Sequence, residues 1–503
     1  MKVSMKTKYL ISSLLSLALL GSGCSDFLDE SNKSNFTPDN YFKTSEHAVS
    51  IVSAAYQDFR LGSESDYGGN PYFMTDFQTG LANTRVGQNV HINNIRLLVN
   101  NSDNGYSKAW WLQSYRGIGN ANLAIERIPS IEMDAALKSR CLGEAYFLRA
   151  YYYFNLVRMF GHIPLILTSI DASSPNLYAD QASTEEVYAQ IVADLLEAEK
   201  SALTWTDESG RASMGVVKSL LAYTYITMAG YPLEKGQAYY KLAADKAKEV
   251  IDHGTYYLFN SYADLHNPDI ENKGEHMFMI QYQASTSVEN PFQTLYLPYN
   301  MDISYYSTET GSIVVYDEFI NTYETGDKRV EEGEFYYTKY TKNGNRAETV
   351  DFGVYHVFKF FDEEANLQTA RSGLNYPLLR YADILLLYAE AQNEADGSPS
   401  VDAYAAINSV RKRANLADLS GLTHDTFQKA VWLERYHELA FENKLWFDMA
   451  RTRKILNLET GNFDNYVGHK FHYGPTLKER ELLFPIPTSE MNNNKKLVQN
   501  SGY

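Results

Sequence analysis

The sequence predicts a mostly α-helical protein that also carries an irregular, tyrosine-rich lobe with little β-structure. Over long stretches, apolar residues recur every three or four positions, which is the pattern of an amphipathic helix with one buried face. These stretches come in pairs joined by short polar turns, and two long segments rich in Tyr, Gly and Asn interrupt them. Helical hairpins that recur along a chain are typical of a tetratricopeptide-like array.

The N-terminal segment predicts export. Three lysines precede a 12-residue apolar run, Tyr9–Leu20, which is too short to span a bilayer and has the length of a signal-peptide core. Small residues then lead into Cys24. Residues 1–23 are therefore predicted to be a lipoprotein signal peptide and Cys24 the lipidated residue, and an ordinary secretory signal is the alternative. Several acyl chains on one cysteine would make a stable membrane anchor.

After the signal, residues 24–46 are polar and acidic and are predicted to form a lipidated tether. Helical periodicity then dominates, and helices are expected over nine segments: 46–60, 108–128, 135–159, 184–204, 213–229, 236–252, 381–395, 401–414 and 426–453. Hairpins are expected from three pairs of them: 108–128 with 135–159, 184–204 with 213–229, and 381–395 with 401–414. Residues in the apolar register of these helices are expected in the core, and they include Trp110, Trp111, Trp446 and Cys141.

Two segments break the helical pattern, residues 61–107 and 255–376. Both are rich in aromatic residues and turn formers, and the second contains short alternating runs such as 354–361. Loops this long within a compact domain are usually functional. We therefore expect the binding surface of the protein in these two segments.

The composition excludes a nucleic-acid partner. The chain has 62 acidic and 45 basic residues, which gives a net charge of −17, and removal of the three N-terminal lysines would lower it to −20. A phosphate backbone needs a basic surface that releases its counterions. The excess of Tyr, 40 residues against 24 Phe and 5 Trp, suggests ligand-facing surfaces as well as core, because Tyr combines an apolar ring with a polar tip.

The sequence gives little sign of catalysis. Glu438 and Glu442 share one helix face, with Glu434 a turn earlier, and could be a catalytic carboxylate pair or a charge network under a helical hairpin. We favour the network. His469 and His472 lack a third obvious metal ligand, and no dinucleotide loop, Walker loop or G-x-S-x-G motif is present. The prediction is a protein that is not an enzyme and has no cofactor and no metal site.

Ordered motifs along the whole mature chain resemble the SusD/RagB family of surface lipoproteins. The most specific block is 144–154 (EAYFLRAYYYF), which Arg158, Gly161 and Pro164 follow. Later blocks agree in order: 380–386 (RYADILL), 434–442 (ERYHELAFE), 446–448 (WFD), 484–487 (FPIP) and 499–503 (QNSGY). The resemblance implies a SusD-like fold with an N-terminal region over 47–260 and a C-terminal RagB/SusD region over 261–503.

The resemblance also implies a role. Such a protein would be a lipid-anchored, surface-exposed outer-membrane protein that captures an oligosaccharide or polysaccharide for a SusC-like TonB-dependent transporter. Two alternatives stay open: a RagB-like protein that captures peptides, and a structural lid of the transporter without its own ligand.

Candidate ligand contacts follow from position and chemistry. A sugar ring needs flat aromatic faces for its C–H side, and Asn, Asp and Arg for its hydroxyl groups. The irregular segments and the loop before residue 380 offer such side chains: Tyr67, Tyr72, Phe73, Arg85, Asn89, His91, Tyr296, Tyr299, Tyr305, Tyr306 and Arg371.

Overall fold

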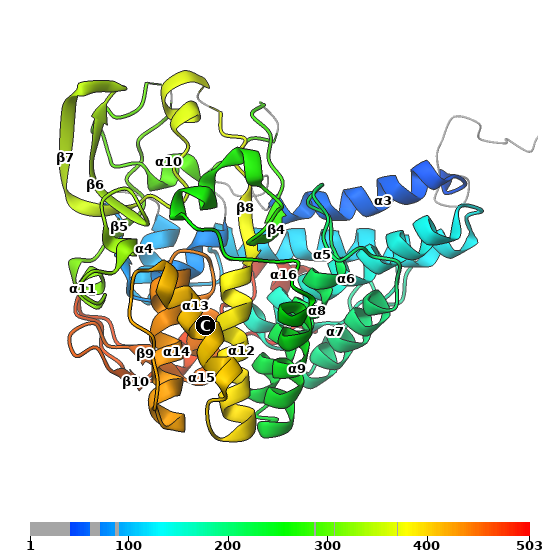
Figure 1. Ribbon diagram of the computed structural model, residues 1–503. Helices are drawn as coiled ribbons and strands as arrows, with labels where there is room; N and C mark the ends of the chain where they lie inside the picture. The colour runs from blue at the N-terminus through cyan, green and yellow to red at the C-terminus, as the bar shows by residue number, and fades with distance from the viewer. Residues whose placement is uncertain (1–40, 61–70, 86–89, 286–287, 306, 370) are drawn as a thin grey trace, which may run out of the picture.

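The structure is a computed structural model that describes residues 41–503 except 61–70, 86–89, 286–287, 306 and 370. The predicted signal peptide, Cys24 and most of the predicted tether therefore lie outside the described residues. The fold is mostly α-helical, as predicted, and Figure 1 shows a helical body beneath an irregular lobe that contains β6, β7 and α10. None of the helices in the described residues is long and apolar enough to cross a membrane.

The helical body is an array of hairpins. Its main helices are α3 (Ser45–Gln57), α5 (Gly105–Arg127), α6 (Ala135–Phe160), α7 (Thr184–Glu199), α8 (Met214–Ala229), α9 (Gln237–His253), α12 (Tyr381–Asp396) and α13 (Val401–Arg413). The three predicted hairpins are confirmed, because α5 packs on α6, α7 on α8, and α12 on α13. Helix α9 packs on both α8 and α12. It therefore joins the two halves of the array, which the lobe separates in the sequence.

Local signals explain where these helices begin. The side chain of Asn104 accepts hydrogen bonds from the first backbone N–H groups of α5, and Asp134 does the same for α6. Ser183 and Glu186 form a capping box at the start of α7. Such caps depend on neighbouring residues only. The predicted starts of α6 and α7 are confirmed, whereas α5 begins three residues before the predicted residue 108.

One helix prediction is wrong. Residues 426–453 do not form a single helix but two, α14 (His424–Leu439) and α15 (Leu445–Thr452). The backbone turns between them, with positive φ angles of 64° at Phe441 and 57° at Asn443. Tertiary contacts hold this turn, since the Glu442 carboxylate accepts hydrogen bonds from Lys359 and Arg380.

The β-structure consists of short antiparallel strands. One sheet has the order β1 (Ala82–Asn83), β5 (Val314–Val315), β7 (Asn345–Val357) and β6 (Tyr336–Lys342). Three further pairs join β4 (His276–Ile280) to β8 (Tyr376–Arg380), β2 (Ile163–Pro164) to β3 (Gln181–Ala182), and β9 (Lys454–Leu456) to β10 (Phe463–Asn465). The β6–β7 hairpin is longer than the alternating run predicted at 354–361, and it forms one edge of the lobe in Figure 1.

Short helical turns connect these elements, and many of them lie in the segments predicted to be irregular. They are η2 (Asp58–Arg60), η4 (Pro71–Gln78), α4 (Val90–Arg96), η5 (Ile128–Ser130), η6 (Tyr262–His266), η7 (Pro268–Ile270), α10 (Gln293–Tyr296), α11 (Asp317–Ile320), η8 (Lys328–Val330), the π-helical turn η9 (Ala365–Thr369), η10 (Glu479–Leu482) and α16 (Thr488–Asn493).

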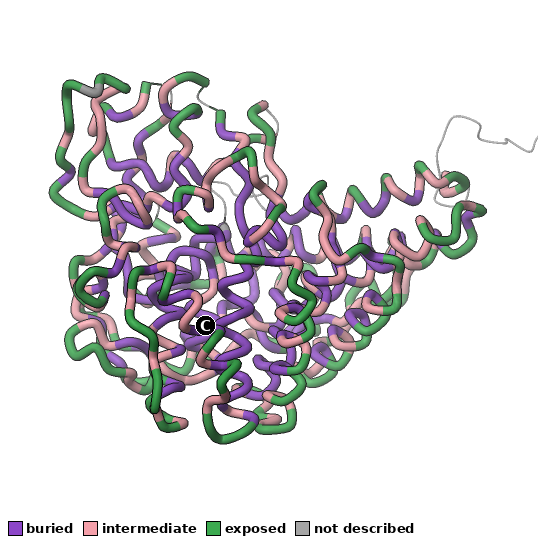
Figure 2. The backbone as a smooth tube through the Cα atoms, viewed as in Figure 1, coloured by how far each residue is buried: buried purple, intermediate pink, exposed green. Residues whose placement is uncertain are grey.

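One hydrophobic core extends through the described chain from Ala48 to Leu497, and Figure 2 shows the buried backbone concentrated in the helical body. The four residues predicted to be core are confirmed, with Trp110, Trp111, Trp446 and Cys141 all buried. A second, small cluster packs inside the lobe beneath the β6–β7 hairpin. The core includes residues from both regions implied by the family resemblance, and the division at residue 260 stays a prediction.

Candidate ligand-binding site

Arg85 and Tyr299 form a pair on the surface of the lobe. The guanidinium carbon of Arg85 lies 3.2 Å from the centre of the Tyr299 ring, while 42% of Tyr299 stays exposed. Arg85 Nε is buried and makes no hydrogen bond with the residues that the structure describes. A guanidinium group stacked on one ring face fixes the orientation of the tyrosine and leaves the rest of its surface to solvent.

A glycine allows this pair to form. Arg85 follows β1, and its backbone N–H donates to the carbonyl of Gly311, 3.4 Å away. Gly311 has a φ of +60°, and a Cβ atom added to it would lie 2.7 Å from Tyr299 Cβ. Any side chain at this position would therefore push the Tyr299 backbone away, so Gly311 is required for the close approach of the two segments.

Glu309 holds the loop that carries Tyr299. Its carboxylate accepts hydrogen bonds from the backbone N–H groups of residues 301–304, at 2.9, 2.6 and 2.9 Å for the last three of them. Within this loop Asn300 and Asp302 adopt positive φ angles, which are uncommon for residues other than glycine. The loop is therefore fixed by internal contacts before any ligand arrives, and this preorganisation lowers the entropic cost of binding.

Tyr305 lies on the same loop and is 64% exposed. Its backbone N–H donates to the carbonyl of Asn366 in η9 at 3.0 Å, and the hydroxyl of Ser304 donates to the same carbonyl at 2.8 Å. Arg371 follows η9, is exposed, and lies 3.9 Å from the Glu289 carboxylate. The structure thus ties the Tyr305 loop to the segment that leads into Arg371.

His91 lies apart from this group. It is partly exposed near the start of α4, where its backbone carbonyl accepts a hydrogen bond from Asn104 and its ring meets the edge of Tyr106 at 6.2 Å.

Three predicted contact residues are in the core instead of on a surface. Tyr72 packs on Trp110 with ring centres 4.7 Å apart, and Phe73 packs on Tyr106 at 5.7 Å. Tyr296, at the end of α10, is 2% exposed. The expectation of ligand contact is therefore corrected for Tyr72, Phe73 and Tyr296, because the faces that would stack on a sugar are occupied by other side chains.

The remaining predicted residues, Tyr67, Asn89 and Tyr306, lie outside the described part of the chain, as does Cys24. Conversely, the sequence did not point to Glu309 and Gly311, which position the pair of Arg85 and Tyr299. The two residues lie in a Thr-Glu-Thr-Gly stretch that matches no known motif. Only the fold shows that Glu309 accepts hydrogen bonds from backbone N–H groups that precede it in the chain, such as that of Ile303.

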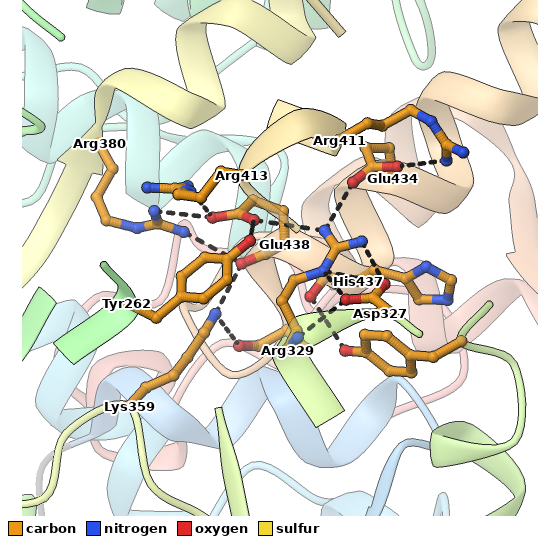
Figure 3. A network of polar contacts seen from close by, with 12 residues as sticks. Tyr262, Asp327, Arg329, Lys359, Arg380, Arg411, Arg413, Glu434, His437 and Glu438 are labelled. Atoms are coloured by element: carbon orange, nitrogen blue, oxygen red, sulfur yellow. Dashed lines mark hydrogen bonds and ion pairs between the residues drawn. The ribbon is translucent and has the colours of Figure 1, made fainter. Parts of the chain in front are cut away.

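The carboxylates weighed as a catalytic pair belong to a buried charge network, as the sequence analysis favoured. Figure 3 shows Glu438 between arginines on two sides. One of its oxygens lies 3.0 Å from Arg380 and 2.7 Å from Arg413, and the other lies 3.4 Å from Arg329. Glu442 pairs with Arg380 at 2.7 Å on the same side of the network. Each carboxylate is thus compensated by several cations in the protein interior.

The network lowers the pKa of one of its carboxylates, Glu442. Burial by itself would raise the pKa of Glu442, but Arg380 and Lys359 outweigh burial and lower this pKa to about 2. Glu438 and Glu442 are both buried. The Glu442 carboxylate, ionised and paired in the interior, is suited to support the fold and lacks the raised pKa of a general acid. Among the described residues, no cluster of three His, Cys, Asp or Glu side chains is placed to bind a metal ion.

Comparison with known proteins identifies two family profiles. The profile described as the SusD family matches residues 233–503, more than half of the chain. A second profile, described as "Starch-binding associating with outer membrane", matches residues 26–225.

Individual relatives extend this match to nearly the whole chain. SusD-like protein P2 of Formosa agariphila is 27% identical over 99% of this chain and 100% of that protein. The crystal structure of a SusD superfamily protein from Parabacteroides distasonis is 38% identical, with a TM-score of 0.87 over 93% of this chain and 100% of that one. Surface glycan-binding protein A from Bacteroides thetaiotaomicron, solved in complex with laminarihexaose, shares the fold with a TM-score of 0.73 at 21% identity, over 91% of this chain and 100% of that one.

Proposed function

Because this chain belongs to the SusD family, we propose that it is a surface glycan-binding lipoprotein that captures oligosaccharide or polysaccharide and delivers it to a SusC-like TonB-dependent transporter. In this proposal the protein binds its ligand without chemically altering it. The lipid on Cys24 holds it at the outer membrane, and the lobe meets the ligand outside the cell.

The observation that carries the proposal is the exposed ring of Tyr299, held against Arg85 on a loop that Glu309 fixes. A flat, rigid aromatic surface suits the C–H face of a pyranose ring, because both surfaces are apolar and neither has to reorganise on contact. The guanidinium beside it supplies donors for sugar hydroxyl groups. Tyr305 adds a second exposed ring on the same loop.

The proposed ligand class also agrees with the relatives. One solved protein of this fold holds laminarihexaose, an oligosaccharide, and one family profile is described as starch-binding.

Calorimetric titration of the purified protein tests the proposal. The panel contains soluble polysaccharides, oligosaccharides including laminarihexaose, and peptide digests. Saturable binding of one glycan class that Tyr299→Ala weakens is the expected result. Binding of peptides alone would instead support peptide capture, and the absence of binding across the panel would support a structural lid.

The membrane anchor needs a separate test. Cells that express the protein are grown with labelled palmitate, and the label is expected on the wild-type protein and absent from the Cys24→Ser variant. Equal labelling of both proteins, or labelling of neither, would contradict lipidation at Cys24.

A further inference from the structure

A cavity of about 470 Å³ lies in the helical body, between the end of α6 and the last residues of the chain. Its walls come from the ends of α6 and α8, the start of α7, helix α15, and residues 478–483 and 500–502. The volume falls within the range of about 300–1,000 Å³ that small-molecule sites occupy. The cavity shares no residue with the Arg85–Tyr299 pair or with the loop that Glu309 holds.

The charged groups that line this cavity are mostly cationic, although the chain as a whole carries −17. One acidic side chain, Glu479, lines it. The cationic side chains are Arg158, Arg451, Arg453, Lys478 and Arg480. Five cationic side chains and one carboxylate around a concave site favour the binding of an anion there.

Two of these cations already have carboxylate partners. Arg451 pairs with Glu390 at 2.6 Å and with Asp448 at 2.9 Å. Arg480 pairs with Glu481 at 2.7 Å. The other three cations make no ion pair with a carboxylate in the described part of the chain, so they are the groups that an anionic ligand would meet.

Arg158 is the most desolvated of these three cations. Its guanidinium carbon lies 3.8 Å from the ring centres of both Phe154 and Phe447. Nε donates to the Phe154 carbonyl at 3.1 Å and Nη2 donates to Asn155 Oδ1 at 2.5 Å. Burial lowers the pKa of Arg158 to about 10. A guanidinium held between two phenylalanine rings keeps its geometry. Arg158 makes no ion pair with a carboxylate of the described residues, and a ligand carboxylate would supply one.

Arg453 lines the same cavity and is partly exposed. Its Nη1 donates to the Ala450 carbonyl at 3.0 Å, while Nε and Nη2 make no hydrogen bond with the described residues. The guanidinium carbon lies 4.7 Å from the ring centre of Tyr231, which is 39% exposed. Two adjacent N–H donors without partners match the two oxygens of a carboxylate.

The other residues that line the cavity indicate the polarity of the uncharged part of the ligand. Apolar side chains make most of the wall: Val157, Tyr188, Phe447, Leu482 and Leu483. Thr184 and Thr227 add hydroxyl groups. Such a lining suits a small molecule with an apolar face, a few polar groups and one charged end.

We propose that this cavity binds a small organic carboxylate, with the carboxylate at Arg453 and Arg158 and the body of the ligand against the apolar wall. Two sources have this chemistry, a uronate sugar and a free aromatic acid. The inference does not depend on glycan capture by the Tyr299 loop, because the two sites share no residue.

Titration of the purified protein with glucuronate and with 4-hydroxybenzoate tests the proposal, with glucose and methyl 4-hydroxybenzoate as uncharged counterparts. At least one carboxylate is expected to bind saturably and at least tenfold more tightly than its counterpart. Preference for glucuronate would identify a sugar-acid site, and preference for 4-hydroxybenzoate a site for a free aromatic acid.

Variants locate the binding. Arg453 is partly exposed and Lys478 is exposed, so Arg453→Gln and Lys478→Gln should fold. Arg453→Gln is expected to weaken carboxylate binding at least tenfold. Arg116→Gln, which changes an arginine 51% exposed elsewhere on the body, is the matched control and should leave binding unchanged. The proposal is overturned if neither carboxylate binds the wild type, if the uncharged counterparts bind equally well, or if the Arg453→Gln and Lys478→Gln double variant binds as tightly as the wild type.

Discussion

The helical body and the Tyr299 loop use arginine, glutamate and tyrosine in opposite ways. In the body, Arg380 is buried and binds Glu438 and Glu442. In the loop, Arg85 stacks on an exposed tyrosine, and Glu309 binds backbone N–H groups instead of a cation. Residue type alone therefore does not tell whether a side chain supports the fold or faces a ligand. Its burial and its partner decide which of the two roles it has.

The largest expected effect comes from removing the central cation of the body. Arg380→Ala would remove a cation that contacts three buried carboxylates, those of Glu275, Glu438 and Glu442. Arg413 would still contact Glu275 and Glu438, but not replace Arg380 beside Glu442. Removing one partner of a buried ion pair typically costs about 3–5 kcal/mol in the free energy of unfolding. Urea unfolding measures this loss.

The matched control is Lys241→Ala, which breaks an exposed ion pair with Asp245 on α9. Exposed pairs typically contribute about 0–1 kcal/mol. If Arg380→Ala destabilised the protein no more than Lys241→Ala does, the buried network would not be what holds the body together.

Two tyrosines three residues apart make the comparison direct. Tyr296 is buried against Phe360, with ring centres 5.0 Å apart, whereas Tyr299 is exposed. Tyr296→Ala should lower the free energy of unfolding by about 3 kcal/mol or more, as for other buried aromatic residues replaced by Ala. Tyr299→Ala is the control in the same urea titration, and a similar loss for both variants would contradict the contrast between them.

Acid should weaken the body through Glu442. The folded-state pKa of about 2 lies below the ordinary value of 4.5, so the ionised carboxylate stabilises the fold above pH 4.5. This contribution is lost as the pH falls from 4.5 towards 2, and the difference corresponds to roughly 3 kcal/mol. Urea unfolding at a series of pH values from 6 to 2.5 measures it. In Glu442→Gln the dependence on pH should be shallower, and an unchanged slope would assign the acid sensitivity to other groups.

In the loop, the effect should fall on binding instead of stability. Tyr299→Ala is expected to weaken glycan binding about tenfold, or ~1.4 kcal/mol, because the stacking face is lost. The glycan is the one that binds the wild type in the panel, and calorimetry gives both affinities. An unchanged affinity would remove Tyr299 from the site.

The smallest expected effect comes from Gly311, where the segment that follows β1 approaches the loop that carries Tyr299. Gly311→Ala adds a Cβ atom at a φ of +60° and 2.7 Å from Tyr299 Cβ. The strain should lower the free energy of unfolding by about 1 kcal/mol and weaken glycan binding as well, because the Tyr299 ring moves from its place. Gly353→Ala, also at positive φ but with open space around it, is the control, and it should lower stability without changing affinity.

Much of the helical body could be predicted because its signals are local. The repeat of apolar residues in α6, the Asp134 cap at its start and the glycine that follows it at position 161 lie within one stretch of chain. The break at residues 440–444 could not be predicted, since Glu442 pairs with Arg380, 62 residues away in the sequence. A pattern of neighbouring residues does not show an ion pair whose second member is distant in the sequence.

The candidate site shows the same limit. Of the tyrosines that the sequence offered in one loop, the structure gives Tyr299 and Tyr305 exposed positions. The sequence could not separate them from Tyr296, because all three have the same side chain in the same polar segment. Whether a tyrosine faces solvent depends on Phe360 and on other residues brought in from elsewhere in the chain.

Most of the long helices, their pairing and the acidic charge therefore follow from the sequence alone, because periodicity, caps and composition are properties of neighbouring residues. The tertiary structure decided which charges are buried, which tyrosines are exposed and where the cationic cavity forms. Those features depend on residues distant in sequence that meet in space, as Arg85 meets Tyr299 and as α6 meets the last residues of the chain.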